Sequence, residues 1–225
     1  MTATQPPIRV AANAAASGHD SAGIMAAMPS ETTPLLPMLR GERVWLRAAT
    51  KADLVEEAAG ISDADTGHFL GVKVPVSAEG GEHFAQQMLS QHGTSLWFFA
   101  ICLIGDDKRI GTVNLRNIDR ENGSAELAIV ISEKALQGQG LGTDALNCLV
   151  DFGFGELRLE RIYLHVFDYN MRAKRSYEKA GFLTDAVLRR ARFHRGQHHD
   201  VHLMSILRDD WLALERRRAW DPPAG

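Results

Sequence analysis

Apolar and polar positions alternate in several short segments of the chain, a pattern typical of β-strands. The first is Arg-Val-Trp-Leu-Arg at residues 43–47, and three further β-rich segments follow at residues 96–104, 109–117 and 125–132. Gly-Asp-Asp at 105–107 and Glu-Asn-Gly at 121–123 supply turn residues between them. This succession predicts an antiparallel meander.

Other segments have apolar residues three and four positions apart and predict helices. Thr50 is placed to cap a helix over residues 52–59, and a helix over residues 80–91 should turn Phe84, Met88 and Leu89 to one side. A longer apolar helix follows residue 143, and another at residues 170–180 ends at Gly181. The expected strands of the second half are residues 161–167, 183–192 and 199–207, the last two joined by a turn at Arg195 and Gly196.

Composition divides the 225 residues into one domain and two tails. Residues 1–37 hold five of the eight prolines and many alanines, but their only charged residues are Arg9, Asp20 and Glu31. Such a segment cannot bury enough apolar surface to offset the entropy of ordering it, so we expect a disordered tail. The predicted domain spans residues 38–215, and a C-terminal tail spans residues 216–225.

Charge and cysteine content exclude several classes of protein. The net charge of −3 argues against a general binder of nucleic acid or of anionic membranes. No apolar run approaches the ~20 residues that a membrane span requires. Cys102 and Cys148 have no neighbouring cysteine, which argues against a zinc ribbon and indicates a reduced, cytoplasmic protein.

A glycine-rich segment precedes the longer helix and is the first candidate for chemistry. Its residues are Gln137, Gly138, Gln139, Gly140, Leu141, Gly142 and Thr143. A glycine turn that leads into a helix offers free backbone N–H groups to an anion such as phosphate. The segment has no lysine for a Walker P-loop and has Thr143 where a Rossmann fingerprint needs its third glycine. A coenzyme A pyrophosphate loop, Gln/Arg-x-x-Gly-x-Gly/Ala, fits Gln137, Gly140 and Gly142, and a plain turn also remains open.

Several segments together resemble the GNAT superfamily of acetyl-CoA-dependent N-acetyltransferases. They are Glu-Leu-Ala-Ile-Val-Ile at 126–131, the glycine-rich segment, Tyr-Leu-His-Val at 163–166, Asn170, and Tyr-Glu-Lys-Ala-Gly-Phe at 177–182, in the family's order and spacing. The resemblance covers about residues 41–207. Residues 41–47 and 200–207 are similar to the branch that contains ribosomal-protein N-terminal acetyltransferases and spermidine acetyltransferases. It implies an α/β (α+β) fold, a single domain with a mixed, splayed central sheet flanked by helices.

The resemblance also implies a reaction. Such an enzyme transfers the acetyl group of acetyl-CoA to a primary amine and needs no metal. The first expectation for the acceptor is a peptide or ribosomal-protein N-terminus, and the alternative is a small amine such as a polyamine or an aminoglycoside. A non-catalytic coenzyme A-binding module is the expectation from another class. Tyr177 would donate a proton to the leaving thiolate, unless it is simply a core tyrosine.

Further roles follow from the same resemblance. The backbone of Val130, Ile131 and Ser132 would pair with the pantetheine arm, and residues 137–143 would wrap the pyrophosphate. Asn170 and Ala173 would contact the cofactor, although an asparagine there can equally cap its helix. Glu126 and His165 are the candidates for the base, with Glu126 preferred and a packed core histidine as the alternative for His165.

The remaining clusters have ordinary explanations. His194, His198, His199 and His202 invite a metal interpretation, but a strand with a two-residue period does not make them converge. Arg189, Arg190, Arg192 and Arg195, with Arg216, Arg217 and Arg218, are expected on a solvated surface. Asp63, Asp65, Glu79 and Glu82 begin helices or attract a cationic amine. Sequence leaves the choice between monomer and homodimer open.

Overall fold

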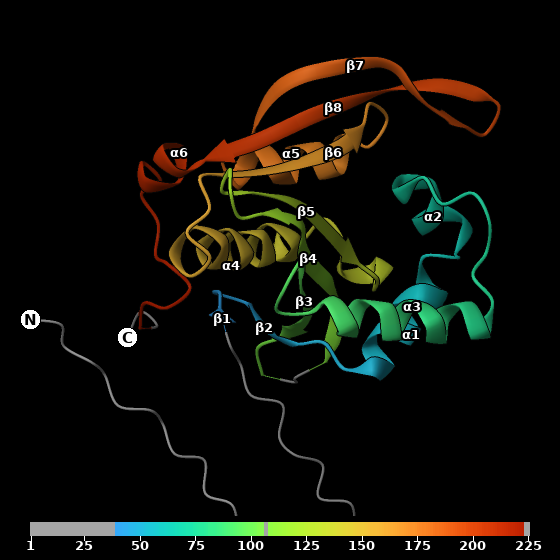
Figure 1. Ribbon diagram of the computed structural model, residues 1–225, viewed down its shortest axis with the longest axis horizontal. Helices are drawn as coiled ribbons and strands as arrows, with labels where there is room; N and C mark the ends of the chain where they lie inside the picture. Colours follow the sequence, from blue (N-terminus) through green and yellow to red (C-terminus); the bar gives the residue numbers. More distant parts are fainter. Residues whose placement is uncertain (1–38, 106–107, 223–225) are drawn as a thin grey trace, which may run out of the picture. The chain divides into compact units, whose positions relative to one another are not determined.

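The structure is a computed structural model that describes residues 39–105 and 108–222 (Figure 1). The predicted tail over residues 1–37 therefore lies outside the described residues, as do Asp106 and Asp107 of the first predicted turn. The strands are β1 (Leu39–Arg40), β2 (Val44–Ala48), β3 (Leu96–Leu103), β4 (Arg109–Asp119), β5 (Ser124–Ile131), β6 (Arg161–Phe167), β7 (Leu183–His194) and β8 (Gln197–Leu207). The α-helices are α1 (Lys51–Gly60), α2 (Ala64–Leu70), α3 (Ala78–Gln91), α4 (Leu141–Gly155), α5 (Met171–Lys179) and α6 (Arg208–Leu212).

The strands form one mixed sheet in the order β1-β2-β3-β4-β5-β6-β8-β7. Strands β3, β4 and β5 pair antiparallel, which confirms the predicted meander. Strand β6 is parallel to β5 but antiparallel to β8, and the β7–β8 hairpin completes the sheet. The α/β fold expected from the sequence is therefore the fold observed.

Helices cover both faces of the sheet, and β3 shows why. Its side chains alternate, so that Phe99 joins the main core with α4, whereas Leu96 and Phe98 pack with Leu54 of α1 and Ala85 of α3. Helix α4 is buried along most of its length, which accounts for the continuous apolar character of its sequence. The functional elements are thus held between two packed layers.

Three features of the fold differ from the sequence-based expectation. Helix α2 was not among the predicted helices, although Asp63 was expected as a possible helix start; it is only one and a half to two turns long, and Asp63 caps it through its side chain. Leu89 is exposed, because the buried side of α3 is centred on Gly81 and Ala85. The segment after Asp210 does not form a solvated basic surface, since Arg216 and Arg218 both reach the buried carboxylate of Asp151.

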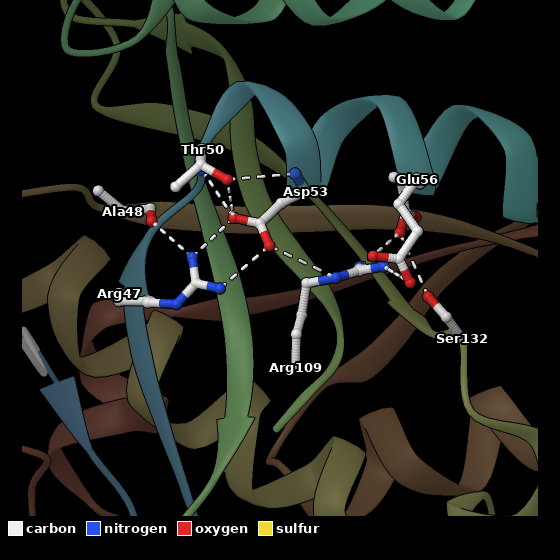
Figure 2. Close-up of polar contacts among 8 residues, drawn as sticks. Arg47, Ala48, Thr50, Asp53, Glu56, Arg109 and Ser132 are labelled. Atoms are coloured by element: carbon white, nitrogen blue, oxygen red, sulfur yellow. Dashed lines mark hydrogen bonds and ion pairs between the residues drawn. The ribbon is translucent and has the colours of Figure 1, made fainter. Parts of the chain in front are cut away.

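A buried ion network fixes the first helix against the sheet (Figure 2). Arg47 of β2 donates two hydrogen bonds to the carboxylate of Asp53, of 2.6 and 3.0 Å, with both side chains less than a tenth exposed. Asp53 also accepts from the backbone N–H of Thr50 and forms a capping box with it. Arg109 of β4 extends the network to Asp53, Glu56 and Glu57.

The network predicts a large, pH-dependent loss of stability for Asp53→Asn. Burial opposes the charge of Asp53, but the hydrogen bonds from Arg47 and Thr50 outweigh it and hold its pKa below the ordinary value. We expect Asp53→Asn to leave buried guanidinium charge unpaired and to cost about 3–5 kcal/mol in urea unfolding at pH 7. A carboxyl with a lowered pKa stabilises the fold above its unfolded pKa, so the difference should shrink as the pH falls below about 4.

The matched control for this prediction is Glu56→Gln on the same helix. Glu56 contacts the same Arg109, but its side chain is 71% exposed. It should therefore change the unfolding free energy by about 1 kcal/mol or less. Equal losses in the two variants would show that the buried pair does not anchor α1.

Candidate active site

Strands β5 and β6 pair over a short distance only and then separate. Their register runs from Ser124↔Arg161 to Glu126↔Tyr163 and stops there, although both strands continue. A cavity of about 1410 Å³ opens between them and is lined by both strands, the glycine-rich segment, α5 and the helices of the α1–α3 layer. This is the splayed sheet that the sequence led us to expect.

The free edge of β5 offers backbone groups to a ligand, and the register shows which ones. Ser132 donates its N–H to the carbonyl of Ile110, at 2.9 Å, so this amide points toward β4. Because an antiparallel ladder alternates, Val130 also turns toward β4, whereas Ile129 and Ile131 turn their backbone toward the cavity. Ser132 moreover does not line the cavity, and its hydroxyl donates to Glu57. The free backbone groups at this edge of β5 are therefore those of Ile129 and Ile131, whereas the expectation had named Val130, Ile131 and Ser132.

The glycine-rich segment ends one turn earlier than the sequence suggested, because α4 already begins at Leu141. Gly140 is its N-cap, with a φ of 84° that favours glycine, and no side chain caps the helix. The first N–H groups of a long buried helix thus face the cavity beside Gly138 and Gly142 without a side-chain acceptor. This arrangement is suited to an anion.

Two residues of this segment turn away from the cavity. Leu141 is buried in the main core, and the side chain of Gln139 donates to the carbonyl of Ala135. The carbonyl of Gln139 accepts a hydrogen bond from Arg43. These contacts hold the segment in place, whereas Gln137, Gly138, Gly140, Gly142 and Thr143 line the cavity.

Gln137 and Arg172 link the two walls of the cavity. The side-chain N–H₂ of Gln137 donates to the carbonyl of Ile131 at 2.7 Å, and its oxygen accepts from Arg172 of α5 at 2.6 Å. The guanidinium of Arg172 also lies over the ring of Phe69 in α2. Sequence reasoning missed Arg172, because the only signal was one arginine in a polar helix turn.

Helix α5 brings three of the expected residues to the cavity: Asn170, Ala173 and Tyr177. The side-chain oxygen of Asn170 accepts from the N–H of Ala173, so Asn170 caps the helix and keeps its N–H₂ group as a possible donor. Tyr177 lines the cavity although its side chain is almost fully buried. Burial raises its pKa to about 12, so the phenol is neutral over the physiological range.

Glu126 and His165 meet where the strands begin to part. His165 Nδ1 lies 3.3 Å from Glu126 Oε1. Arg116 holds the same carboxylate through hydrogen bonds of 3.0 and 3.1 Å, and Asn117 adds one of 2.9 Å. Desolvation alone would raise the pKa of Glu126, but the hydrogen bonds and charge of Arg116, assisted by His165, lower it below its ordinary value. Glu126 is therefore a firmly ionised and weakly basic carboxylate.

The α1–α3 layer forms the other half of the cavity. Glu57 and Asp65 are its carboxylates, and its apolar lining, together with that of the adjoining strand β3, comes from Ile61, Phe69, Leu70, Val72, Phe84, Met88, Leu96 and Phe98. Asp63 and Asp65 both pair with Lys134, so the acidic residues of α2 tie this helix to the segment after β5. Glu79 and Glu82 do not line the cavity.

The histidines of the β7–β8 hairpin are spread over different contacts. His194 lies 3.1 Å from His68 of α2, and His199 lies near Asp168. His202 contacts Lys174, and His198 contacts the carbonyl of Arg190. Among residues 39–105 and 108–222, no group of three or more His, Cys, Asp or Glu side chains is arranged to hold a metal ion. None of the helices in these ranges is long and apolar enough to span a membrane.

Comparison with known proteins shows the family to which the chain belongs. Residues 43–183 match the model of the acetyltransferase (GNAT) domain. A spermidine N(1)-acetyltransferase of Vibrio cholerae is 37% identical over 103 residues, which cover 46% of this chain and 59% of that protein. The putative ribosomal N-acetyltransferase YdaF of Bacillus subtilis is 31% identical over 109 residues, covering 48% of this chain and 59% of that protein. The chain thus spans about three fifths of the length of these curated relatives.

A solved structure extends the likeness. The crystal structure of spermidine N-acetyltransferase from Vibrio cholerae, in complex with CoA and spermine, superposes with a TM-score of 0.69 and 28% sequence identity. The superposition covers 75% of this chain and 98% of that chain. The free N-terminus of α4 and the exposed edge of β5 fit the diphosphate and pantetheine portions of coenzyme A, because they present unused N–H groups to such groups.

The N-terminus of α4 allows a test of anion binding in which affinity and stability change in opposite directions. A Cβ at Gly142 would meet only Ile131, at 3.7 Å, so a side chain fits there. Gly142→Asp should stabilise the helix by placing a carboxylate in its first turn, but should repel a diphosphate. We expect calorimetric affinity for coenzyme A to fall at least tenfold, a change of about 1.4 kcal/mol, while Tm stays equal or rises.

Gly142→Asn is the matched control, because it has nearly the same shape without the charge. It should retain most of the affinity of the unmodified protein. If Asn weakened coenzyme A as much as Asp did, the loss would be steric and the helix N-terminus would not be the anion site.

Proposed function

This chain belongs to the GNAT acetyltransferase family, and we propose that it transfers the acetyl group of acetyl-CoA to a primary amine of a small polycation of the polyamine class. One observation carries the proposal. Where the strands part, one cavity is lined by the N-terminus of α4, which has no side-chain cap, and by the free edge of β5. The neutral phenol of Tyr177 and the ionised carboxylate of Glu126, which lies beside His165, line the same cavity. Each of these groups answers one demand of acyl transfer to an amine.

The protein groups around the thioester have separate tasks. Acetyl-CoA supplies an acyl group activated as a thioester. The N–H groups of Ile129 and Ile131 are the free strand-edge donors that can polarise a carbonyl oxygen. Tyr177 keeps its proton because its pKa is about 12. Full transfer to a thiolate with a pKa of about 8.5 would be uphill by several kcal/mol, so Tyr177 acts chiefly by donating a hydrogen bond as the sulfur becomes anionic.

The base is better assigned to His165 than to Glu126. An attacking amine must lose a proton, and a weakly basic carboxylate already bonded to Arg116 and Asn117 accepts one poorly. The side chain of His165 is 43% exposed, lines the cavity and lies against Glu126, whose carboxylate can orient the imidazole. Glu126 is then a positioning residue.

The lining of the α1–α3 half supports an aliphatic polycation as the acceptor. Methylene groups can pack on Phe69, Phe84 and Met88, and ammonium groups can approach Glu57 and Glu126. The likeness to the structure with bound CoA and spermine supports the same class. A peptide N-terminus is the second candidate, favoured by the 31% identity to the putative ribosomal N-acetyltransferase.

The reaction is tested by measuring free thiol released from acetyl-CoA with spermidine, an aminoglycoside and a peptide with a free N-terminus. We expect turnover with spermidine, and Tyr177→Phe should lower kcat by roughly 100-fold while coenzyme A still binds. Tyr163→Phe is the control, because this ring lies on β6 and does not line the cavity. Coenzyme A binding without turnover on any acceptor would indicate a binding module and contradict the proposal.

The assignment of the base is tested by comparing two variants. His165→Asn should lower kcat/KM for spermidine by roughly 100-fold, because it removes the proton acceptor. Glu126→Gln keeps the shape of the positioning residue and should lower kcat/KM less. A larger loss in Glu126→Gln than in His165→Asn would reverse the two roles.

A further inference from the structure

The acceptor half of the cavity contains an amide whose oxygen has no partner. The side-chain oxygen of Asn114 is buried and accepts no hydrogen bond from any residue that the structure describes, and Asn114 as a whole is only 8% exposed. Leaving such an atom unpaired costs about 1–3 kcal/mol. Asn114 nevertheless lines the cavity, so a ligand in the cavity can supply the missing donor.

The position of Asn114 in the sheet explains why its side chain lies at the wall of the cavity. Asn114 lies on β4 directly opposite Ala128 of β5, whose side chain is a single methyl group and has no polar atom to offer the amide. Thr112 lies on the same face two residues before Asn114 on β4. Arg116, the partner of Glu126, lies on this face two residues after it. Asn114 therefore lies about 7 Å along the strand from the Arg116–Glu126 pair.

Negative charge is available beside this amide. Glu57 is 4% exposed, lines the cavity, and is bonded to Thr112 and to the hydroxyl of Ser132. The network of Figure 2 sets the guanidinium groups of Arg47 and Arg109 against the carboxylates of Asp53, Glu56 and Glu57. Three carboxylates face two guanidinium groups, so by formal charges the network has one carboxylate in excess, which a cation can balance.

We propose that Asn114 and Glu57 form a distal subsite that receives the second nitrogen of a diamine or polyamine while its primary amine reacts beside His165. The oxygen of Asn114 accepts an N–H from that second nitrogen, and Glu57 balances its charge. This spacing of two residues along the strand, about 7 Å, suits a nitrogen separated from the reacting amine by a short methylene spacer. The inference rests on the proposed function and adds the feature by which the acceptor is recognised.

Kinetics with two acceptors that differ in one nitrogen test the subsite. The acceptors are putrescine and n-butylamine, which has the same carbon chain but no second nitrogen. Asn114→Leu fills the same space without an acceptor atom. We expect it to raise KM for putrescine roughly tenfold or more and to leave KM for n-butylamine unchanged.

The same variant should melt no lower than the unmodified protein, because it removes an unpaired buried polar atom. Asn114→Ala, which empties the space instead of filling it, should show the same selective loss and covers the case in which Leu prevents folding. An equal rise of KM for both amines, or no rise for either, would overturn the subsite.

A binding measurement separates this inference from the proposed reaction. Putrescine is titrated calorimetrically into the protein saturated with coenzyme A, which requires no turnover. Binding of putrescine that Asn114→Leu weakens supports the subsite even if no acetyl transfer is found, in which case only the proposed function fails. Transfer to putrescine with calorimetric affinity unchanged by Asn114→Leu would overturn the subsite and leave the function standing.

Discussion

The short pairing of β5 with β6 is the constraint on which the rest of the site depends. Beyond Glu126↔Tyr163, the facing backbone N–H and C=O groups of both strands lose their natural partners. A buried strand edge without partners is costly, so either the strands close or another group satisfies them. In this fold Gln137 satisfies one carbonyl, that of Ile131, and the edge at Ile129 remains available to an extended ligand.

The surrounding layers keep the strands apart at the cost of burying charge. Helix α4 packs its apolar side against β2, β4 and β5, and the ion network around Asp53 fixes α1 over the opposite face. The walls of the cavity therefore do not depend on contact between β5 and β6. Within it, environment separates two titratable groups: burial keeps Tyr177 protonated, and Arg116 keeps Glu126 ionised. Such opposed shifts are how neighbouring groups acquire different roles at one pH.

Local sequence patterns predicted most of the fold, because these strands, caps and turns are determined by residues close together in the sequence. The meander strands alternate, Thr50 and Asn170 are effective caps, and Gly140 stands where a positive φ is required. Contacts between distant segments could not be predicted in this way. The sequence near Ser132 does not reveal which strand its N–H faces, and nothing local connects Arg172 with Gln137 or Arg216 with Asp151. These facts depend on register and on packing over long separations in the chain.

Asn114 illustrates how a local conflict can point to function. The alternation of side chains along β4 places Asn114 on the same sheet face as Thr112. An apolar residue at this position would not lose a hydrogen bond of the Asn114 side-chain oxygen, because that oxygen has none among the described residues. A buried amide without a partner lowers stability, and proteins tend to tolerate such costs where a ligand repays them. The same reasoning applies to Glu57, a buried carboxylate of the network around α1. Burial raises its pKa despite its contacts with Thr112, Arg109 and Ser132, which means that its charged form is costly in this environment. Both features lie on the acceptor side and both are relieved by a cationic N–H donor, so one ligand accounts for two otherwise separate costs.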